Sequence, residues 1–254
     1  MVNIILSGCG GRMGQAIVKA AKDFEGCRIL AGVDINADSV APVCEFPVYQ
    51  SISELTDKAD VIVDFSHHSA LPALTEYAVR TGTPVVVATT GHTDEEKAIM
   101  LEASKKVAVF FSGNMSIGIN LLIELCKIGA QTLGTAFDVE IIEKHHNQKL
   151  DAPSGTAIMI ADAIKEERAD TEYVYDRHSV RQARNTAEIG IHSVRGGTIV
   201  GEHEVIFAGN NETITLSHSA ASREIFAGGA LRAAKYLAGK DAGLYNMSDL
   251  INGR

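Results

Sequence analysis

The sequence predicts a two-domain α/β protein, in which one domain has a parallel sheet and a smaller α+β domain has an open, mostly antiparallel or mixed sheet. Two observations support this fold class. Apolar β-like runs alternate with amphipathic helical stretches through residue 112, as in a parallel sheet covered by helices. After a helix over 119–132, the pattern changes to short β-like runs separated by glycine and asparagine turns, and a last helix follows.

The first β-like run, residues 2–7, ends in a glycine turn that contains Gly8, Gly11 and Gly14 and leads into an amphipathic helix over 15–24. Glycines at this point allow a tight turn, the approach of a pyrophosphate to the backbone and close packing of the helix on the strand. Asp34 ends the second strand, where an acidic side chain accepts hydrogen bonds from an adenosine ribose. An ordinary glycine turn with a strand-end aspartate is the alternative. Together these features predict a Rossmann-type dinucleotide-binding domain.

The other elements follow from periodicity and turn residues. In the first domain we expect strands over 28–33, 60–65, 83–88 and 107–111, a turn over 66–69 that opens a helix to about Arg80, a helix over 94–105, and a loose connection over 36–58. In the second domain we expect β-like runs over 189–194, 198–200, 204–208 and 213–219, before a final helix that ends at Leu237.

Composition and charge exclude several classes of protein. The chain has 254 residues, 46% of them hydrophobic and 22% charged, as in an ordinary globular protein. Its net charge of −9 and its lack of basic runs argue against a nucleic-acid or membrane-surface partner. No apolar stretch approaches the ~20 residues that span a bilayer. The four cysteines form no Cys-x-x-Cys pair, which favours a reducing, cytoplasmic setting.

The segment over 138–161 holds the strongest candidate for a reactive site. A β-branched run, interrupted by Glu140 and Glu143, leads to His145 and His146. Lys149 follows, and Ser154-Gly155-Thr156 opens a helix after a proline. The N–H groups of a helix start and the positive end of its dipole bind anions. A proton-transfer group and an anion cradle within a dozen residues therefore indicate an active site.

Each feature also has an ordinary interpretation. Adjacent histidines in a strand point to opposite faces, an isolated lysine usually lies on the surface, and a serine before a helix is usually only an N-cap. The coincidence of all three in one loop favours a functional site. A metal-dependent hydrolase is not expected, because none of the nine histidines has helical metal-ligand spacing.

The segment Glu-Lys-His-His-Asn-Gln-Lys-Leu-Asp-Ala-Pro-Ser-Gly-Thr-Ala, over 143–157, resembles the signature of the dihydrodipicolinate reductase family. Other segments are also similar to the family pattern. They are Gly-Cys-Gly-Gly-Arg-Met-Gly over 8–14, Ala-Thr-Thr-Gly over 88–91, the Gly113–Asn120 crossing between domains, Arg195–Glu204, and the segment over 222–230 that opens the final helix. The chain departs from the pattern at Ala88 and Met115, where many members have glycine and phenylalanine. It also carries His67 and His68 in a turn where some members have arginine.

The resemblance implies an NAD(P)H-dependent reductase that acts on a cyclic dicarboxylate in lysine biosynthesis. It implies a dinucleotide-binding domain over 1–115 and 223–254 and a substrate-binding and oligomerisation domain over 116–222. The implied roles are catalytic for His145 and Lys149, and substrate-binding for His146, Ser154, Gly155 and Thr156. The implied cofactor contacts are Gly8, Gly11, Arg12, Met13, Gly14, Asp34, Ala88, Thr89, Thr90, Ser112 and Met115.

Asp34 is followed by Ile35-Asn36-Ala37, so no basic residue in sequence offsets repulsion of a 2′-phosphate. We therefore expect NADH to be preferred over NADPH, with both usable and no metal required. The family resemblance also implies a homotetramer. Two alternatives are another NAD(P)-dependent amino-acid dehydrogenase on the same two-domain plan and a non-enzymatic NAD-sensing protein.

Overall fold

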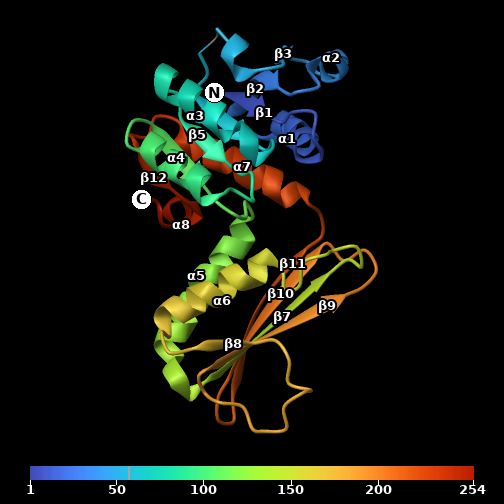
Figure 1. Ribbon diagram of the computed structural model, residues 1–254, viewed down its shortest axis with the longest axis vertical. Helices are drawn as coiled ribbons and strands as arrows, with labels where there is room; N and C mark the ends of the chain where they lie inside the picture. Colours follow the sequence, from blue (N-terminus) through green and yellow to red (C-terminus); the bar gives the residue numbers. More distant parts are fainter. Residues whose placement is uncertain (57) are drawn as a thin grey trace. The chain divides into compact units, whose positions relative to one another are not determined.

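A computed structural model describes residues 1–56 and 58–254 (Figure 1). The chain forms two compact units. Unit 1 comprises Met1–Ile117 and Glu224–Arg254, and unit 2 comprises Gly118–Arg223. No helix within the described ranges is both long enough and apolar enough to span a membrane.

Unit 1 contains a twisted sheet in which every strand pair is parallel. The strand order is β12-β6-β5-β4-β1-β2-β3. The strands are β1 (Val2–Ser7), β2 (Cys27–Val33), β3 (Val48–Tyr49), β4 (Val61–Asp64), β5 (Val85–Val87), β6 (Ala108–Phe111) and β12 (Gly243–Tyr245). The central strands are buried on both faces, which explains why they are continuous β-branched runs and do not alternate.

Helices cover both faces of this sheet (Figure 1). One core cluster joins the sheet to α1 (Arg12–Asp23) and α7 (Glu224–Leu237), and the other joins it to α3 (Leu71–Thr81) and α4 (Asp94–Ser104). Short elements complete the unit: α2 (Ala37–Val40), η1 (Ala41–Val43), η2 (Ile52–Glu54), η3 (His68–Ala70) and α8 (Met247–Asn252). The strand order reverses between β1 and β4, and ligands of such folds bind beyond the carboxyl ends of strands at this point.

Unit 2 is built on a mixed sheet with the order β11-β10-β7-β9-β8. The strands are β7 (Asp138–His145), β8 (Glu172–Val174), β9 (Glu188–Arg195), β10 (Gly201–Ala208) and β11 (Thr213–Ala220). β10 pairs with β7 and β11 in antiparallel fashion, whereas β9 pairs with β7 and β8 in parallel. The expectation of a mixed sheet is confirmed, but antiparallel pairs do not dominate it.

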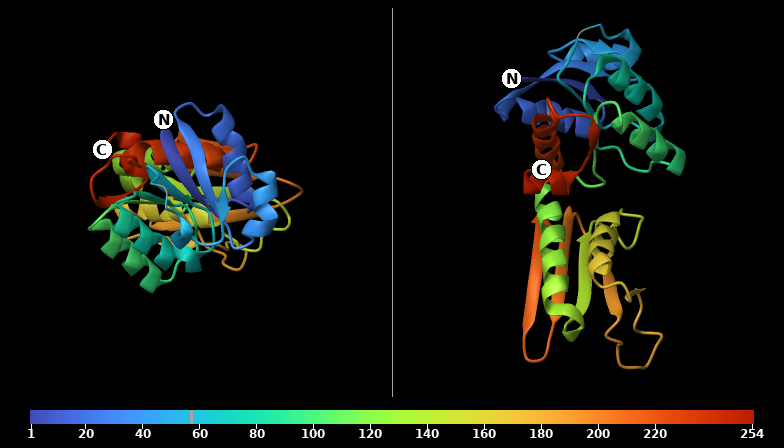
Figure 2. Two further views of the ribbon diagram at one scale, coloured as in Figure 1. Left: turned by 90° about the horizontal axis from the view of Figure 1, so that it is seen from above. Right: turned by 90° about the vertical axis from the view of Figure 1, so that its left-hand side faces the viewer.

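Two helices, α5 (Ile117–Leu133) and α6 (Gly155–Glu167), cover one face of this sheet (Figure 2). Their apolar side chains and the inward residues of β7, β9 and β10 form one buried cluster. Along β7 the buried positions are Val139, Ile141, Glu143 and His145, as the two-residue period of a strand requires. The same period that buries two apolar side chains therefore also buries a carboxylate and an imidazole.

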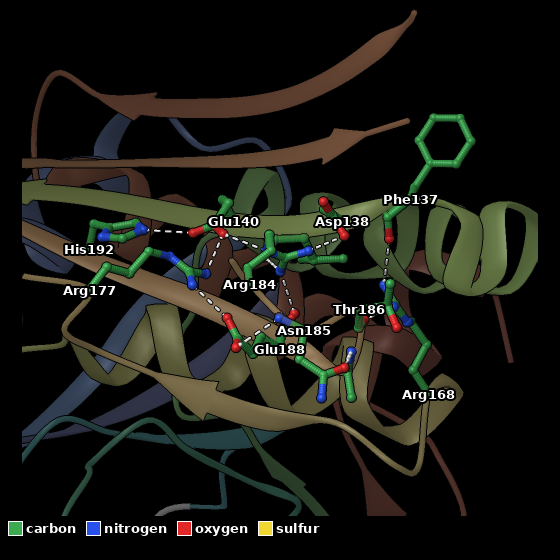
Figure 3. A network of polar contacts seen from close by, with 12 residues as sticks. Phe137, Asp138, Glu140, Arg168, Arg177, Arg184, Asn185, Thr186, Glu188 and His192 are labelled. Atoms are coloured by element: carbon green, nitrogen blue, oxygen red, sulfur yellow. Dashed lines mark hydrogen bonds and ion pairs between the residues drawn. The ribbon is translucent and has the colours of Figure 1, made fainter. Parts of the chain in front are cut away.

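The other face of β7 carries an ion-pair network (Figure 3). Glu140 lies 2.6 Å from Arg177 and 2.7 Å from His192, and Arg184 pairs with Asp138. Arg168 donates to the backbone oxygens of Phe137 and Thr186. These contacts tie the long segment before β9 to the sheet.

Most predicted elements are present, with boundaries shifted by a few residues. The glycine-turn helix begins at Arg12, three residues earlier than predicted, because the turn leads directly into it. The strand expected over 198–200 is wrong: this stretch is a turn between β9 and β10. The loose connection over 36–58 contains α2, η1, β3 and η2, and no sequence signal predicted β12 or α8.

Candidate active site and cofactor-binding turn

The glycine turn of unit 1 needs glycine at two positions for steric reasons. Gly8 has φ +77°, and a Cβ there would lie 2.6 Å from the backbone oxygen of Phe65 at the end of β4. A Cβ on Gly14 would lie 2.2 Å from the backbone oxygen of Gly8. The turn and the first turn of α1 are therefore packed backbone against backbone. Gly11 caps α1 without a side-chain hydrogen bond, which leaves the helix start suited to an anion.

Asp34 lies beside this turn. One oxygen of its carboxylate accepts from the backbone N–H of Gly10 at 2.9 Å, and the other accepts from that of Asn36 at 3.0 Å. Through these two contacts the aspartate holds the glycine turn against the end of β2. It is only half-buried, so its remaining acceptor sites face the cavity described next.

A cavity of about 630 Å³ opens beyond the carboxyl ends of β1, β2 and β4. Gly8, Gly11 and Asp34 line it, together with Ile35 and His67. Among the described residues that line it, none is a lysine or an arginine. The cavity lies at the reversal of strand order, where this fold class binds its ligands.

The other predicted cofactor residues lie near these strand ends without lining this cavity. Arg12, Met13 and Gly14 form the first turn of α1, and Ala88, Thr89 and Thr90 follow β5. Ser112 donates to the backbone oxygen of Asn114 at 2.8 Å, and Met115 is only 3% exposed within the core. The structure therefore brings three of the predicted residues, Gly8, Gly11 and Asp34, into one cavity. Four others have buried side chains: Ala88, Thr89, Ser112 and Met115.

Asp64, at the end of β4, organises this region and was not predicted. It is buried and accepts from the hydroxyl of Thr89 at 2.7 Å, and also from Ser66. It thus links the turns that follow β4 and β5. The two histidines in the turn after β4 are also held in place. The side chain of His67 caps η3 by accepting from the backbone N–H of Ser69, and His68 lies 2.8 Å from Glu96.

In unit 2, His145 is the last residue of β7 and is 9% exposed. Its Nδ1 lies 2.6 Å from Oε2 of Glu143, which has no exposed surface. Two guanidinium nitrogens of Arg195 donate to the same carboxylate at 2.7 and 2.8 Å. Burial by itself disfavours ionisation of Glu143, but hydrogen bonds from Arg195 and His145, among others, outweigh it and lower its pKa to about 2.

The start of α6 adjoins this group. Ser154 caps the helix, because its hydroxyl accepts from the backbone N–H of Ala157 at 3.1 Å. The same hydroxyl lies 3.1 Å from Nε2 of His203, and the backbone N–H of Ser154 donates to Glu143. Gly155 is exposed and Thr156 half-buried at the mouth of the helix. The predicted anion cradle is thus a capped helix start next to the buried imidazole.

Lys149 lies in the same loop, and its ammonium group is 2.8 Å from Asp151. This hydrogen bond is the main reason why the pKa of Asp151 is lowered, and the backbone N–H of Gly155 contributes to the shift. The carboxylate of Asp151 therefore interacts with two groups that were predicted to bind an anion. His146, which was also predicted to bind substrate, is half-buried, and its Nε2 lies 3.4 Å from a guanidinium nitrogen of Arg223.

His203 is buried between His145 and the helix cap. Burial, and secondarily the proximity of His145, lowers its pKa from 6.5 to about 4. In the unfolded chain this histidine therefore binds a proton near pH 6.5, whereas in the folded chain it binds one only near pH 4. Stability must fall as the pH drops through this window, by roughly 3 kcal/mol when it is crossed completely.

We expect the free energy of unfolding to decrease between pH 7.5 and 5.0, and His203→Gln to flatten this decrease. Glutamine can still bond to Ser154 but does not titrate, and carboxylates contribute little slope above pH 5. Urea denaturation at several pH values measures the slope. His178→Gln, at an exposed position, is the control and should leave it unchanged. Burial also lowers the pKa of His218, so a smaller slope should remain in this variant. A slope that is not reduced in His203→Gln would show that His203 does not contribute to it.

Sequence reasoning missed Glu143, Arg195, His203, Asp64 and Asp151. Glu143 was read as a charge that interrupts an apolar run. A period of two, however, places it on the same face as His145, and this signal was available. The pairing of Arg195 with Glu143 depends on the parallel register of β7 and β9, which the sequence does not specify. Among the described residues, no three metal-binding side chains come together.

A parallel sheet with a glycine turn at its reversal point, followed by a second unit with a buried imidazole beside a helix start, defines a two-domain NAD(P)H-dependent oxidoreductase. Two family models match nearly the whole chain: "Dihydrodipicolinate reductase, N-terminus" over residues 2–115, and "Dihydrodipicolinate reductase, C-terminus" over residues 118–251. The chain belongs to the dihydrodipicolinate reductase family.

Individual relatives agree with this assignment. The chain is 53% identical to 4-hydroxy-tetrahydrodipicolinate reductase of Caldanaerobacter subterraneus subsp. tengcongensis, over 99% of this chain and 98% of that protein. It is 48% identical to the protein of the same name from Clostridium novyi, over the full length of both. Among solved structures, dipicolinate-bound dihydrodipicolinate reductase from Paenisporosarcina sp. TG-14 matches with a TM-score of 0.81 and 28% identity, over 97% of each chain.

Proposed function

We propose that this chain reduces 4-hydroxy-tetrahydrodipicolinate to tetrahydrodipicolinate with NAD(P)H, in lysine and diaminopimelate biosynthesis in the cytoplasm. The observation that carries the proposal is the succession of His145 at the end of β7, Lys149 in the loop that follows and the start of α6, within a chain whose two halves match the family. The dipicolinate in the Paenisporosarcina structure supports a planar dicarboxylate as the ligand of this group. The free state of all four cysteines fits a reducing compartment.

The cofactor belongs to the domain formed by 1–115 and 223–254. When bound, nicotinamide supplies the hydride. Gly8 and Gly11 let the backbone approach the pyrophosphate, and Gly14 lets α1 pack closely against the turn. The first turn of α1, with Arg12 and Met13, faces the pyrophosphate with N–H groups. Asp34 accepts from the adenosine ribose. The turns that hold Ala88, Thr89, Thr90, Ser112 and Met115 provide the remaining contacts, from Ser112 and Met115 through the backbone.

The substrate belongs to the domain formed by 116–222. After water leaves the substrate, a hydride adds to an electron-poor ring carbon conjugated to the imine. Negative charge then develops toward the ring nitrogen, and His145 donates a proton there. Lys149 stabilises this charge. His146, Ser154, Gly155 and Thr156 bind a substrate carboxylate, the last two through backbone N–H groups at the α6 start.

The carboxylate of Asp151 has a place in this scheme. It interacts with Lys149 and Gly155, two of the groups assigned to the substrate carboxylate. An incoming dicarboxylate must compete with it. Because Asp151 is more than half-exposed, it can turn into water at little cost when the substrate arrives.

We expect NADH to be preferred over NADPH by roughly tenfold, the equivalent of ~1.4 kcal/mol. The charge of Asp34 disfavours a 2′-phosphate, and no basic side chain among the described cavity-lining residues offsets it. Ile35 lines the cavity and is 81% exposed, so Ile35→Arg should place a cation at the phosphate and improve the use of NADPH. The measurement is kcat/KM for each cofactor with freshly generated substrate at low salt.

The matched control for this variant is Ile99→Arg, which adds the same charge to a partly exposed position on α4 in a different surface groove. It should leave the ratio of the two kcat/KM values unchanged. Wild type that uses NADPH as well as NADH would contradict the proposed preference. No turnover with either cofactor would contradict the proposed reaction.

We also propose a homotetramer assembled through the sheet of unit 2. The face of this sheet that is turned away from α5 and α6 carries the half-exposed Ile142, Ile206 and Val194 among its charged residues. Apolar side chains on an uncovered sheet face favour association with another copy. A solution mass of one chain, from light scattering, would contradict this assembly.

A further inference from the structure

Glu143 is the most completely buried charged residue near the proposed acid, and the reaction scheme gives it no task. It precedes His145 by two positions on β7, so both side chains lie on the face covered by helices. A buried carboxylate is costly unless donors satisfy it. The donors that satisfy Glu143 indicate what it does.

The two oxygens of this carboxylate have separate partners. Oε2 lies 2.6 Å from Nδ1 of His145 and accepts a hydrogen bond from one guanidinium nitrogen of Arg195 at 2.8 Å. Oε1 accepts hydrogen bonds from the backbone N–H of Ser154 at 3.1 Å and from the other guanidinium nitrogen of Arg195 at 2.7 Å. One oxygen therefore holds the imidazole and the other holds the start of α6.

These contacts determine where the proton lies between Glu143 and His145. With a pKa of about 2, the carboxylate is ionised at neutral pH and can only accept hydrogen bonds. The proton of the 2.6 Å contact must then be on Nδ1 of His145. Nε2 is left as the atom that exchanges a proton with a ligand, and the absence of a side chain at Gly201 leaves room beside it.

Arg195 keeps this carboxylate in place. Besides its paired contacts with Glu143, it donates to the backbone oxygen of Asp151 at 2.7 Å. The backbone N–H of the following residue, Gly196, donates to the oxygen of His145 at 2.9 Å. The guanidinium therefore joins the end of β9, the loop that carries Lys149, and the carboxylate in one rigid arrangement.

We propose that Glu143, held by Arg195, is the positioning residue of this site: it fixes the orientation and tautomer of His145 and sets the α6 start beside it. The proposal rests on the assignment of His145 as the proton donor. A single carboxylate thus aligns the proton donor with the carboxylate-binding helix start. A merely structural ion pair would stabilise the unit without any effect on the imidazole.

The test compares Glu143→Gln with wild type. We expect kcat to fall at least tenfold, as is usual when the partner that orients a functional histidine is lost, with the Kd for NADH unchanged. Nitrogen-15 NMR of histidine-labelled protein at alkaline pH, with His145→Gln to assign the signal, should show the Nδ1–H form in wild type. Glu143→Gln should show a mixture, because an amide can donate or accept.

The control is Glu140→Gln, on the same strand but on its other face, where Glu140 pairs with Arg177 and His192. It removes a comparable ion pair and should change neither kcat nor the His145 signal. A Glu143→Gln protein with normal kcat and an unchanged tautomer would overturn the proposal. An Nε2–H form in wild type would overturn it too. This outcome is read from wild-type protein and does not depend on whether Glu143→Gln folds.

Arg195→Lys provides a second variant, since it keeps the charge and loses the paired geometry. It should lower kcat and broaden the tautomer population less than Glu143→Gln does, and the absence of both effects would contradict the role of Arg195. The NMR readout requires no turnover. A failure of the proposed reaction would therefore appear as an inactive wild type that still shows the Nδ1–H form of His145.

Discussion

Replacing His145 with glutamine should lower kcat by roughly 10²- to 10⁴-fold, the usual range when a general acid is lost. Glutamine keeps much of the volume of the side chain and can bond to Glu143, but it cannot transfer a proton at neutral pH. The Kd for NADH should hardly change, because the cavity and glycine turn lie in unit 1 and His145 lies in unit 2. Steady-state kinetics and a fluorescence titration with NADH measure the two quantities.

The control for this variant is His192→Gln. His192 lies on the neighbouring strand β9, on the outer face of the sheet, and its side chain is 40% exposed. Its loss should leave kcat close to that of wild type. A His145→Gln enzyme with a near-normal kcat would refute its assignment as the proton donor.

Gly14→Ala should weaken NADH binding by roughly 100-fold, the equivalent of about 3 kcal/mol. The added Cβ would lie 2.2 Å from the oxygen of Gly8 and 2.7 Å from Cα of Cys9. Both are backbone atoms, so the turn must open to relieve the overlap, and this turn lines the cofactor cavity. Calorimetric titration with NADH measures the loss, and dipicolinate binding to unit 2 should be retained.

Gly228→Ala is the matched control, since Gly228 is also a helical glycine of unit 1 and a Cβ there meets no atom within 4 Å. It should bind NADH normally and raise stability by up to about 1 kcal/mol, because alanine is favoured over glycine in a helix. Normal NADH binding by Gly14→Ala would show that the close packing of this turn is not required.

Local sequence patterns were sufficient to predict most of the fold. The parallel sheet of unit 1 was predicted because strands buried on both faces must be apolar along their length, and the runs ending at Ser7 and Asp64 are. β12 could not be predicted in this way. It has three residues, only pairs with the edge of β6, and has a half-exposed leucine at its centre. Its position depends on tertiary pairing, which leaves no periodic pattern.

The candidate site was predicted in part, for a similar reason. One short stretch of sequence contains His145, Lys149 and the α6 start, so a local pattern was enough to predict them together. Glu143 was visible but was misread, because a charge in an apolar run has two meanings: it either ends the buried face or belongs to it. Arg195 and His203 reach the site through strand pairing with β7, and pairing register is not encoded in any single segment.

The central claim is that this chain transfers a hydride from nicotinamide to a cyclic dicarboxylate. The most direct measurement uses NADH with deuterium at the transferable C4 position and substrate generated from pyruvate and aspartate semialdehyde. Mass spectrometry of the product should show tetrahydrodipicolinate one mass unit heavier, formed in step with the loss of NADH absorbance. Dipicolinate should suppress this transfer in competition with the substrate. Loss of NADH absorbance without label in the product, or no loss at all, would contradict the account.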